Sequence, residues 1–272
     1  MILKKTLSIL AVVVFAVACT TNPFTGKSTL ALVPNSQILP MAFQQYDQFL
    51  SEHDVVTGTS ESKMIKNIGR KISTASERWL TANGYAGYLK DYAWEYNLVN
   101  DDAVNAWCMP GGKIVFYTGI LPVAKNESGI AAVMGHEVAH ALANHGQQRM
   151  SAGQLQALGA VAGNVALAKD PKNQQIFNQS YGIASTVGVM LPFSRNHESE
   201  ADRIGLTLMA IAGYDPIVAA ELWVRMKEAA GGAPPEFLST HPSSDTRINN
   251  ITAWAPDAKA EARKYGVTKF KR

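Results

Sequence analysis

The amino-acid sequence predicts an α+β protein that is mostly helical and contains one small β-sheet. Apolar residues recur at helical spacing over most of the chain, whereas residues 92–117 have the pattern of strands. The 272 residues are 47% hydrophobic and 17% charged, which excludes a disordered chain and allows a full core. A net charge of only +3 predicts no binding to nucleic acid.

Two helices are predicted before the sheet, at residues 36–53 and 61–80. In the second, apolar residues recur at helical spacing among Lys and Arg, and Asn83-Gly84 follows as a stop signal. These apolar residues are Met64, Ile65, Ile68 and Ile72.

The sheet is predicted from two short segments. Trp94, Tyr96 and Leu98 alternate with other residues in the first segment. A β-branched and aromatic run at residues 114–117 follows the turn Pro110-Gly111-Gly112 and forms the second.

After Pro122 nearly the whole chain has a helical pattern, with breaks at 170–171, 191–192, 213–216 and 231–235. Residues 154–168 and 181–191 are rich in Ala, Gly and Val. Both segments fall short of the ~18 uninterrupted apolar residues expected of a membrane span, and Gln154, Gln156 and Asn164 interrupt the first. We expect helices that are buried in a core or close over a cleft; a second membrane attachment is the alternative.

The N-terminus has the layout of a secretory signal. Lys4 and Lys5 precede an apolar run at residues 7–18 that ends in small residues before Cys19. The sequence Ala16-Val17-Ala18-Cys19 resembles a bacterial lipobox, in which the cysteine is acylated; the alternative is an ordinary signal peptide with an incidental cysteine. We therefore expect a lipoprotein signal peptide at 1–18, a tether at 19–35 and one domain at 36–272.

The sequence Gly135 to Ala141 contains the motif H-E-x-x-H as His136, Glu137 and His140. Residues four apart on a helix share one face, so the two imidazoles can hold one zinc ion while the Glu137 carboxylate reaches a water molecule beside it. Uncharged residues surround the motif, as expected of a buried catalytic helix.

A catalytic zinc typically has a third protein ligand. The candidates are His145, His197, Glu198 and Glu200, of which His145 is expected at the surface or as a cap of the zinc helix. Residues 194–205 are the better source. Glu198 and Asp202 are four apart on a predicted helix, so one can bind metal and the other can orient an imidazole.

Together, these motifs resemble the gluzincin peptidase family that contains HtpX and the CAAX prenyl endopeptidases. The likeness is closest to its soluble bacterial lipoprotein branch, typified by BepA and LoiP. We expect this chain to be a protease domain alone, without tetratricopeptide repeats. It covers residues 22–254 through the tether, the segment NAWCMPGGKIVFYTGIL, HEVAH, SRNHESEAD and HPSSDTRI. The resemblance implies a zincin-type domain whose small sheet edges the active-site cleft, with the HExxH helix beneath it.

The resemblance also implies roles for individual residues. His136, His140 and Glu198 would hold one Zn²⁺, Glu137 would act as general base, and Asp202 would support a ligand. His241 and Arg247 would donate to the oxyanion; His241 has the alternative role of an inhibitory fourth ligand.

Residues 105–117 would form the upper edge of the cleft and pair with an extended peptide. The residues predicted to bind substrate are Asn105, Gly112, Ile114 and Phe116. Cys108 stands where the family commonly has a small apolar residue, and it is expected to be a buried thiol or a redox-sensitive position.

The expected function is zinc-dependent endoproteolysis of misfolded or stalled envelope proteins at the bacterial outer membrane, facing the periplasm. Thr20 after the lipidated cysteine favours the outer over the inner membrane. The expected partners are these substrates, the membrane through the lipid on Cys19, and the outer-membrane assembly machinery. The alternatives are a chaperone-like assembly factor whose proteolysis is inhibited by His241, and a metallohydrolase of another substrate class.

Overall fold

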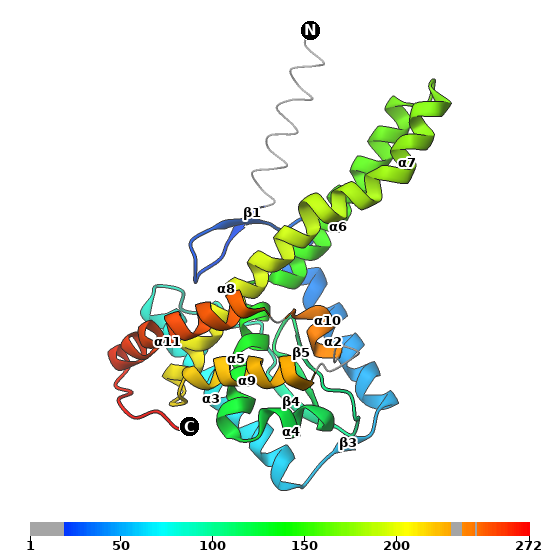
Figure 1. Ribbon diagram of the computed structural model, residues 1–272. Coiled ribbons are helices and arrows are strands. Elements are labelled where there is room, and N and C mark those ends of the chain that lie inside the picture. The colour runs from blue at the N-terminus through cyan, green and yellow to red at the C-terminus, as the bar shows by residue number, and fades with distance from the viewer. Residues whose placement is uncertain (1–18, 230–235, 243) are drawn as a thin grey trace. The chain divides into compact units, whose positions relative to one another are not determined.

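The computed structural model describes residues 19–229, 236–242 and 244–272, coloured along the chain in Figure 1. The chain divides into two compact units. The first comprises residues up to Ile38 together with Asn144–Asn196, and the second comprises Leu39–Ala143 and His197–Arg272. The signal peptide predicted at 1–18 and the break predicted at 231–235 lie outside the described residues.

The second unit contains the predicted sheet. Its four strands lie in the order β3 (Val55–Val56), β4 (Glu95–Val99), β6 (Lys113–Tyr117) and β5 (Ala106–Met109). β5 and β6 form an antiparallel hairpin at the predicted turn, where Gly111 and Gly112 have positive φ. β6 runs parallel to β4, which places β6 inside the sheet and β5 at its edge.

Helices make up most of the remainder, as the sequence predicts. Their bounds in the second unit are α3 (Ser60–Ala82), α4 (Leu121–Ala124), α5 (Glu127–Leu142), α9 (Ile217–Ala229), α10 (Glu236–Thr240) and α11 (Asp245–Lys264). Helices α2 (Asn35–Glu52) and α8 (Leu191–Ile211) run across the boundaries between the units. Thr59 caps α3, and Gly84, with φ +88°, follows its end. The helices predicted at 36–53 and 61–80 are therefore confirmed.

Helix α5 is enclosed by the rest of the second unit. It packs against α3, α9 and β5, and every residue from Ser128 to Leu142 is buried. This burial explains the absence of charged residues around the HExxH motif, because a charge placed there would lose its hydration.

Helices α5 and α8 touch through their backbones at two glycines. A Cβ added to Gly205 would lie 2.9 Å from both the carbonyl carbon of Gly135 and the amide nitrogen of His136. A Cβ added to Gly135 would lie 2.9 Å from the carbonyl oxygen of Gly205. Because neither glycine has a side chain, the helices approach closely enough for their side chains to meet around one point.

In the first unit, residues predicted to be a tether form a packed β-hairpin. β1 (Cys19–Thr21) pairs antiparallel with β2 (Ser28–Leu30), and β2 lies against α6 (His145–Ala166). The backbone N–H of Leu32 donates to Ser151 Oγ, at 3.0 Å. His145, predicted at the surface or as a cap, is fully buried at the start of α6.

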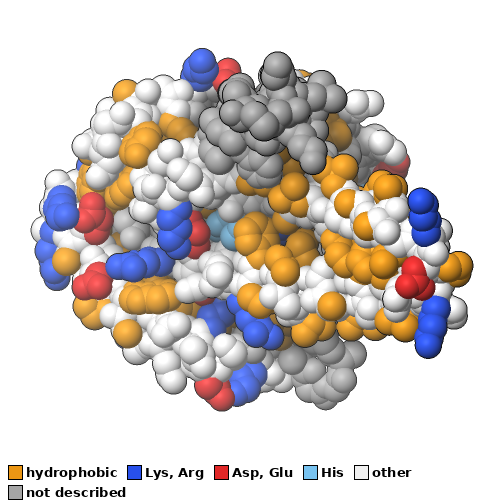
Figure 2. All heavy atoms as spheres, turned by 90° about the horizontal axis from the view of Figure 1, so that it is seen from above, with side chains coloured by type: hydrophobic (Ala, Val, Ile, Leu, Met, Phe, Trp, Pro, Cys, Tyr) orange, Lys and Arg blue, Asp and Glu red, His pale blue; other side chains and the backbone are white. Residues whose placement is uncertain are grey.

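The apolar helices of the first unit differ from the prediction. α6 is followed by α7 (Pro171–Ser185), which begins at the predicted break, and by the π-helix η2 (Thr186–Met190). From Ala152 to Asn196 no residue is buried, so the expectation of helices buried in a core was wrong. Figure 2 shows hydrophobic side chains gathered on the surface of these helices. Among the described residues, no helix is long and apolar enough to cross a bilayer.

The glycine contact predicts that Gly205→Ala lowers the free energy of unfolding by about 1 to 3 kcal/mol, because the methyl group overpacks the helix crossing. Gly182→Ala in α7 is the matched control, since no atom outside its own helix lies within 4 Å of the added Cβ. There, alanine should stabilise the helix by up to about 1 kcal/mol. Urea denaturation of the three proteins measures both effects; equal stability of Gly205→Ala and wild type would contradict the overpacking.

Candidate metal centre

Helix α5 places the three motif residues deep in the second unit. His136, Glu137 and His140 are each at most 5% exposed. Asn126 caps the helix by accepting a hydrogen bond from the backbone N–H of Gly129 at 2.9 Å. The Nε2 atoms of His136 and His140 point at each other across one helical turn, 3.1 Å apart.

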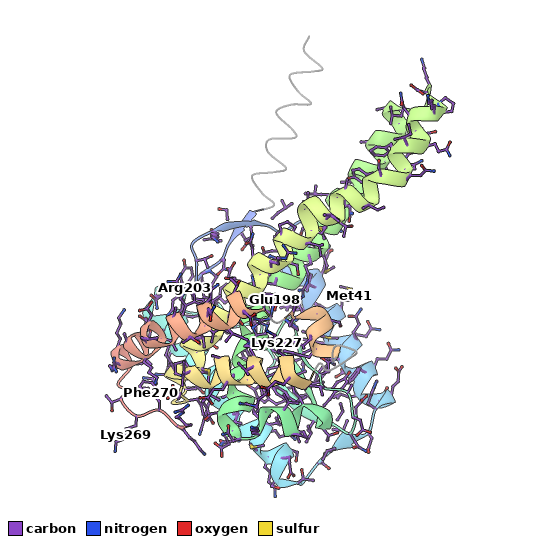
Figure 3. All side chains as sticks on the ribbon, viewed as in Figure 1. Met41, Glu198, Arg203, Lys227, Lys269 and Phe270 are labelled. Carbon is purple, nitrogen blue, oxygen red and sulfur yellow. The ribbon has the colours of Figure 1, made fainter. Side chains whose placement is uncertain are left out.

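The α8 helix and the loop after α10 bring two further groups to the same point. Glu198 lies on α8 (Figure 3), with Oε2 at 3.3 Å from His136 Nε2 and Oε1 at 3.2 Å from His140 Nε2. His241 Nδ1 lies 2.9 Å from Glu198 Oε2 and 3.1 Å from His136 Nε2. One ligand atom from each of these four residues lies within 4.8 Å of the others.

These four groups fit a zinc ion. Zinc bonds of about 2.0 Å that point to the corners of a tetrahedron hold their ligand atoms about 3.3 Å apart. Five contacts between these nitrogen and oxygen atoms measure 2.9 to 3.3 Å, close to that spacing, and all four ligand atoms lie within 4.8 Å of one another. In the described part of the chain, neither His145, His197 nor Glu200 belongs to the group.

Electrostatics set the protonation of the three predicted ligands. Burial lowers the pKa of His140 well below its usual value, which favours the neutral imidazole that a metal requires. Burial alone would raise the pKa of Glu198, but hydrogen bonds with His136, His140 and His241 hold it well below its usual range. For His136, burial is outweighed by hydrogen bonds to Asp202 and Glu198, which raise its pKa to about 9.

Asp202 and Arg247 form the polar support of the site. Asp202 Oδ1 lies 2.9 Å from His136 Nδ1, while Arg247 donates to both carboxylate oxygens of Asp202 at 2.6 and 2.7 Å. Arg247 Nη1 also lies 3.2 Å from Glu198 Oε2. The paired guanidinium lowers the pKa of Asp202, so its carboxylate stays ionised and can accept a hydrogen bond from the His136 ring.

Two aromatic residues, Trp223 and Phe237, contact Arg247 and His241. Neither of them was predicted from the sequence. The Arg247 guanidinium lies 3.5 Å from the centre of the Trp223 ring, and Phe237 stacks on His241 with ring centres 4.6 Å apart. Trp223 and Phe237 also stack on each other at 5.6 Å. Both occur outside any recognisable motif, so only the folded chain brings them to the site.

His241 takes the place of the fourth group rather than lying free in a loop. Its backbone N–H donates to Phe237 O at 2.8 Å, and its side chain is largely buried. While Nδ1 faces the ligand atoms, Nε2 lies 3.5 Å from Glu137 Oε1. His241 therefore belongs to the four-residue group, and this position is compatible with either of the two roles expected for it.

The substrate-binding prediction needs correction at two residues. Ile114 and Phe116 lie on the inner strand β6, with both backbone edges facing neighbouring strands and both side chains fully buried. They therefore cannot pair with a peptide. The strand order leaves β5, which packs along α5, as the edge beside the site.

The other residues near this edge have structural surroundings of their own. Gly112 packs against the Trp94 ring in the turn, and Asn105 is largely buried before β5, where its Oδ1 accepts from the backbone N–H of Ala106. Burial and the nearby Glu137 raise the pKa of the Cys108 thiol well above its usual value, which favours an unreactive thiol.

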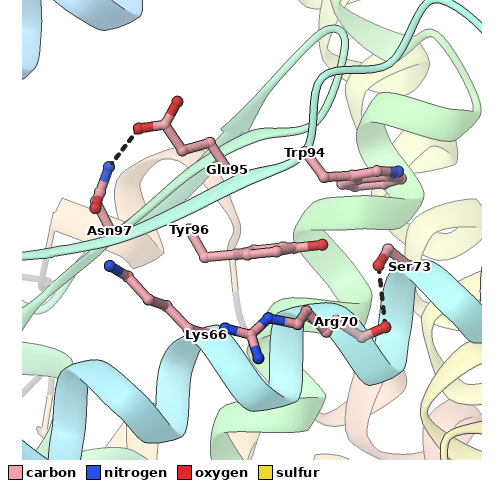
Figure 4. Close-up of a pocket in the computed structure, with 7 residues that line it drawn as sticks. All are labelled: Lys66, Arg70, Ser73, Trp94, Glu95, Tyr96 and Asn97. Carbon is pink, nitrogen blue, oxygen red and sulfur yellow. Dashed lines mark hydrogen bonds between the residues drawn. The ribbon is translucent and has the colours of Figure 1, made fainter.

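A hollow lies between α3 and β4 (Figure 4). The side chains that line it are Lys66, Arg70, Ser73, Trp94, Glu95, Tyr96 and Asn97. None of the predicted site residues is among them, so the metal centre is elsewhere.

A mostly helical α+β domain with an HExxH helix and an acidic ligand on a second helix defines a gluzincin-type zinc metallopeptidase. A model of peptidase family M48 matches residues 71–255, and the chain belongs to this family. The matched residues include the whole group that is suited to one metal ion.

Relatives from two kinds of source match this chain. The mitochondrial metalloendopeptidase OMA1 of Schizosaccharomyces pombe is 38% identical over 192 residues, covering 70% of this chain and 54% of the relative. OMA1 of Saccharomyces cerevisiae is 36% identical, covering 71% and 56%. The beta-barrel assembly-enhancing protease of Escherichia coli (strain K12) is 26% identical, covering 86% and 47%. The chain thus spans about half the length of these curated relatives.

The raised pKa of His136 predicts that zinc binding at pH 7 releases about one proton, because the metal must displace it. Apparent zinc affinity should then rise by about tenfold per pH unit up to about pH 9 and level off above it. Calorimetry in buffers of different ionisation enthalpy counts the protons.

In Asp202→Asn, one of the two carboxylates that raise the pKa of His136 is gone. The variant should release a smaller fraction of a proton at pH 7 and bind zinc about 10- to 100-fold more weakly. Binding to the wild type without proton release at pH 7 would show that His136 is neutral before the metal arrives.

Proposed function

We propose that this chain is a zinc-dependent endopeptidase of the bacterial cell envelope that cleaves misfolded or stalled envelope proteins. The observation that carries the proposal is the buried convergence of His136, His140 and Glu198, with Glu137 on the same helix. Membership of family M48 supports peptide cleavage. The name of the Escherichia coli relative, a beta-barrel assembly-enhancing protease, supports an envelope role.

The proposed location rests on the N-terminal residues. A lipid on Cys19 would attach the protein to the outer membrane, facing the periplasm, because Thr20 does not resemble a retention signal for the inner membrane. Two acyl chains supply enough buried CH₂ groups for stable anchoring. Outer-membrane assembly machinery would then lie within reach as a partner.

Each polar group at the centre has a defined role in the proposed reaction. Zinc held by His136, His140 and Glu198 would acidify a water molecule and polarise the scissile carbonyl. Glu137 accepts the proton of the attacking water and passes it to the leaving amine. Arg247 and a displaced His241 donate to the oxyanion, where one preorganised donor contributes about 3 kcal/mol.

The outer edge of β5 is the proposed place for the substrate. An extended peptide that pairs with Ala106–Met109 would bind through main-chain hydrogen bonds, a mode that tolerates many side chains. Because folded proteins rarely offer an unpaired extended segment, this edge favours unfolded substrates.

A second candidate function follows from His241. With its Nδ1 among the ligand atoms, the enzyme would be held inactive, and the protein could act as a chaperone-like assembly factor until a partner displaces the loop. This candidate and the protease share the same metal centre and differ in whether cleavage is the resting activity.

For the general base, we predict that Glu137→Gln binds zinc as wild type does but loses at least about 100-fold in the rate of peptide cleavage. Glutamine keeps the size of the side chain and cannot accept the proton. Mass spectrometry measures the zinc content of the variant, and cleavage of unfolded casein measures its activity. A zinc-loaded variant with full activity would refute this mechanism.

For His241, an inhibitory ligand predicts that His241→Ala cleaves an unfolded substrate faster than wild type, because the fourth position opens. An oxyanion donor predicts the reverse, a loss of about 100-fold. Initial rates at saturating zinc distinguish the two roles. Phe237→Leu, which removes only the stacked ring, should shift the rate in the same direction as His241→Ala if the ring holds the inhibitory position.

A further inference from the structure

The two long helices of the first unit place polar groups between them and apolar groups outside. Asn164 and Asn178 exchange side-chain hydrogen bonds at 2.8 and 3.0 Å, and Gln156 donates to Ser185 Oγ at 2.6 Å. The hydroxyl of Tyr181 donates to Gln156 O at 3.0 Å. Of the polar residues that interrupt the apolar pattern of α6, Gln156 and Asn164 are thus hydrogen-bonded within the helix pair, here called the hairpin (residues 152–194).

Small residues let the two helices of the hairpin approach closely. A Cβ on Gly159 would lie 2.1 Å from the Tyr181 hydroxyl oxygen, and one on Gly163 would lie 2.1 Å from the Phe177 ring. Their spacing of four residues is the small-xxx-small pattern that joins helices in membranes. Two aromatic side chains of α7 thus pack against glycines of α6 at this interface.

The outer surface of the hairpin carries the large aliphatic side chains. Eight of them are between 45% and 71% exposed: Leu158, Val161, Val165, Ile176, Ile183, Val187, Val189 and Leu191. Scattered exposed apolar residues are normal on proteins that face water, but a continuous group on one element marks an interaction surface. Figure 2 shows such a gathering of hydrophobic side chains on these helices.

Charge is confined to the ends of the hairpin. Residues 150–168 and 173–194 contain no Asp, Glu, Lys or Arg. The flanking charged residues are Arg149, Lys169, Asp170, Lys172 and Arg195, of which only Asp170 is negative. Four cations around an uncharged apolar surface complement the phosphates of an anionic bilayer and would repel the same surface of a second copy.

We propose that the hairpin is a peripheral membrane attachment that lies in the interface of an anionic bilayer, separate from any lipid on Cys19. Its aliphatic side chains enter the acyl region, while Lys169 and Lys172 at the tip contact phosphate groups. Hydrogen bonds between the helices satisfy polar groups of Gln156, Asn164 and Tyr181 within the hairpin, which lowers the cost of placing them in the interface. β1, which contains Cys19, pairs with β2, and Leu32 just after β2 bonds to Ser151, so a lipid on Cys19 would reach the base of the hairpin.

Flotation with vesicles tests the proposal on the chain from residue 19 to 272, which contains all the described residues. Cys19→Ser in every sample removes the acylation site. Vesicles of phosphatidylcholine and phosphatidylglycerol should carry this protein upward in a density gradient. Leu158→Gln with Val165→Gln should weaken binding at least about tenfold, because both exposed side chains lose their transfer energy.

The matched control is Met41→Gln with Val224→Gln, two comparably large apolar residues that are exposed on α2 and α9 of the second unit. This control should float as the parent protein does. Lys169→Gln and Lys172→Gln should each weaken binding about fivefold. Vesicles of phosphatidylcholine alone should bind less protein than the anionic ones. Thermal melting of each variant shows that it remains folded.

Three outcomes would overturn the proposal. The parent protein could fail to float with anionic vesicles, or the Leu158 and Val165 variant could float equally well. The third is a parent protein that sediments as a dimer without vesicles while this variant is a monomer, which would assign the surface to self-association. None of these outcomes bears on peptide cleavage, since the hairpin contains no residue of the metal centre.

Discussion

The contact between the backbones of Gly135 and Gly205 is the constraint on which the geometry of the metal centre depends. At this crossing α5 and α8 approach closely enough for His136 to meet both Glu198 and Asp202. Any side chain at either glycine would separate the helices, because the nearest atoms are backbone and cannot rotate away. A glycine inside a helix lowers stability by about 1 kcal/mol relative to alanine, and the crossing requires a glycine in each of the two helices.

Around the crossing, buried acids and bases compensate one another. Three carboxylates, three imidazoles and one guanidinium are buried together, where a charge on any one of them alone would be strongly disfavoured. Their hydrogen bonds form a continuous network from Arg247 through Asp202 to His136 and Glu198. The aromatic rings of Trp223 and Phe237 hold the edges of this network in place, so its rigidity comes from packing as well as charge.

The sequence predicts the helical elements and the metal-binding helix well, because their signals are local. Spacing alone places His136 and His140 on one face, and the periodicity of α3 marks its length. The parallel pairing of β6 with β4 is not a local property, and this is why Ile114 and Phe116 were assigned to an edge that they do not form. The apolar pattern of α6 is also ambiguous, because a helix buried in a core and a helix with an exposed apolar surface can have similar compositions. Trp223 has no motif of its own and is recognised only through its contact with Arg247.

The order of the ligands along the chain has a consequence for how this family can diversify. His140 precedes the hairpin in the chain and Glu198 follows it, and both residues belong to the same ligand group. The hairpin contributes no atom to the four-residue ligand group. The length and surface of the hairpin can therefore change while the contact between α5 and α8 stays the same. The same metal centre can in this way be combined with hairpins of different surface, without any change in the residues that hold the metal.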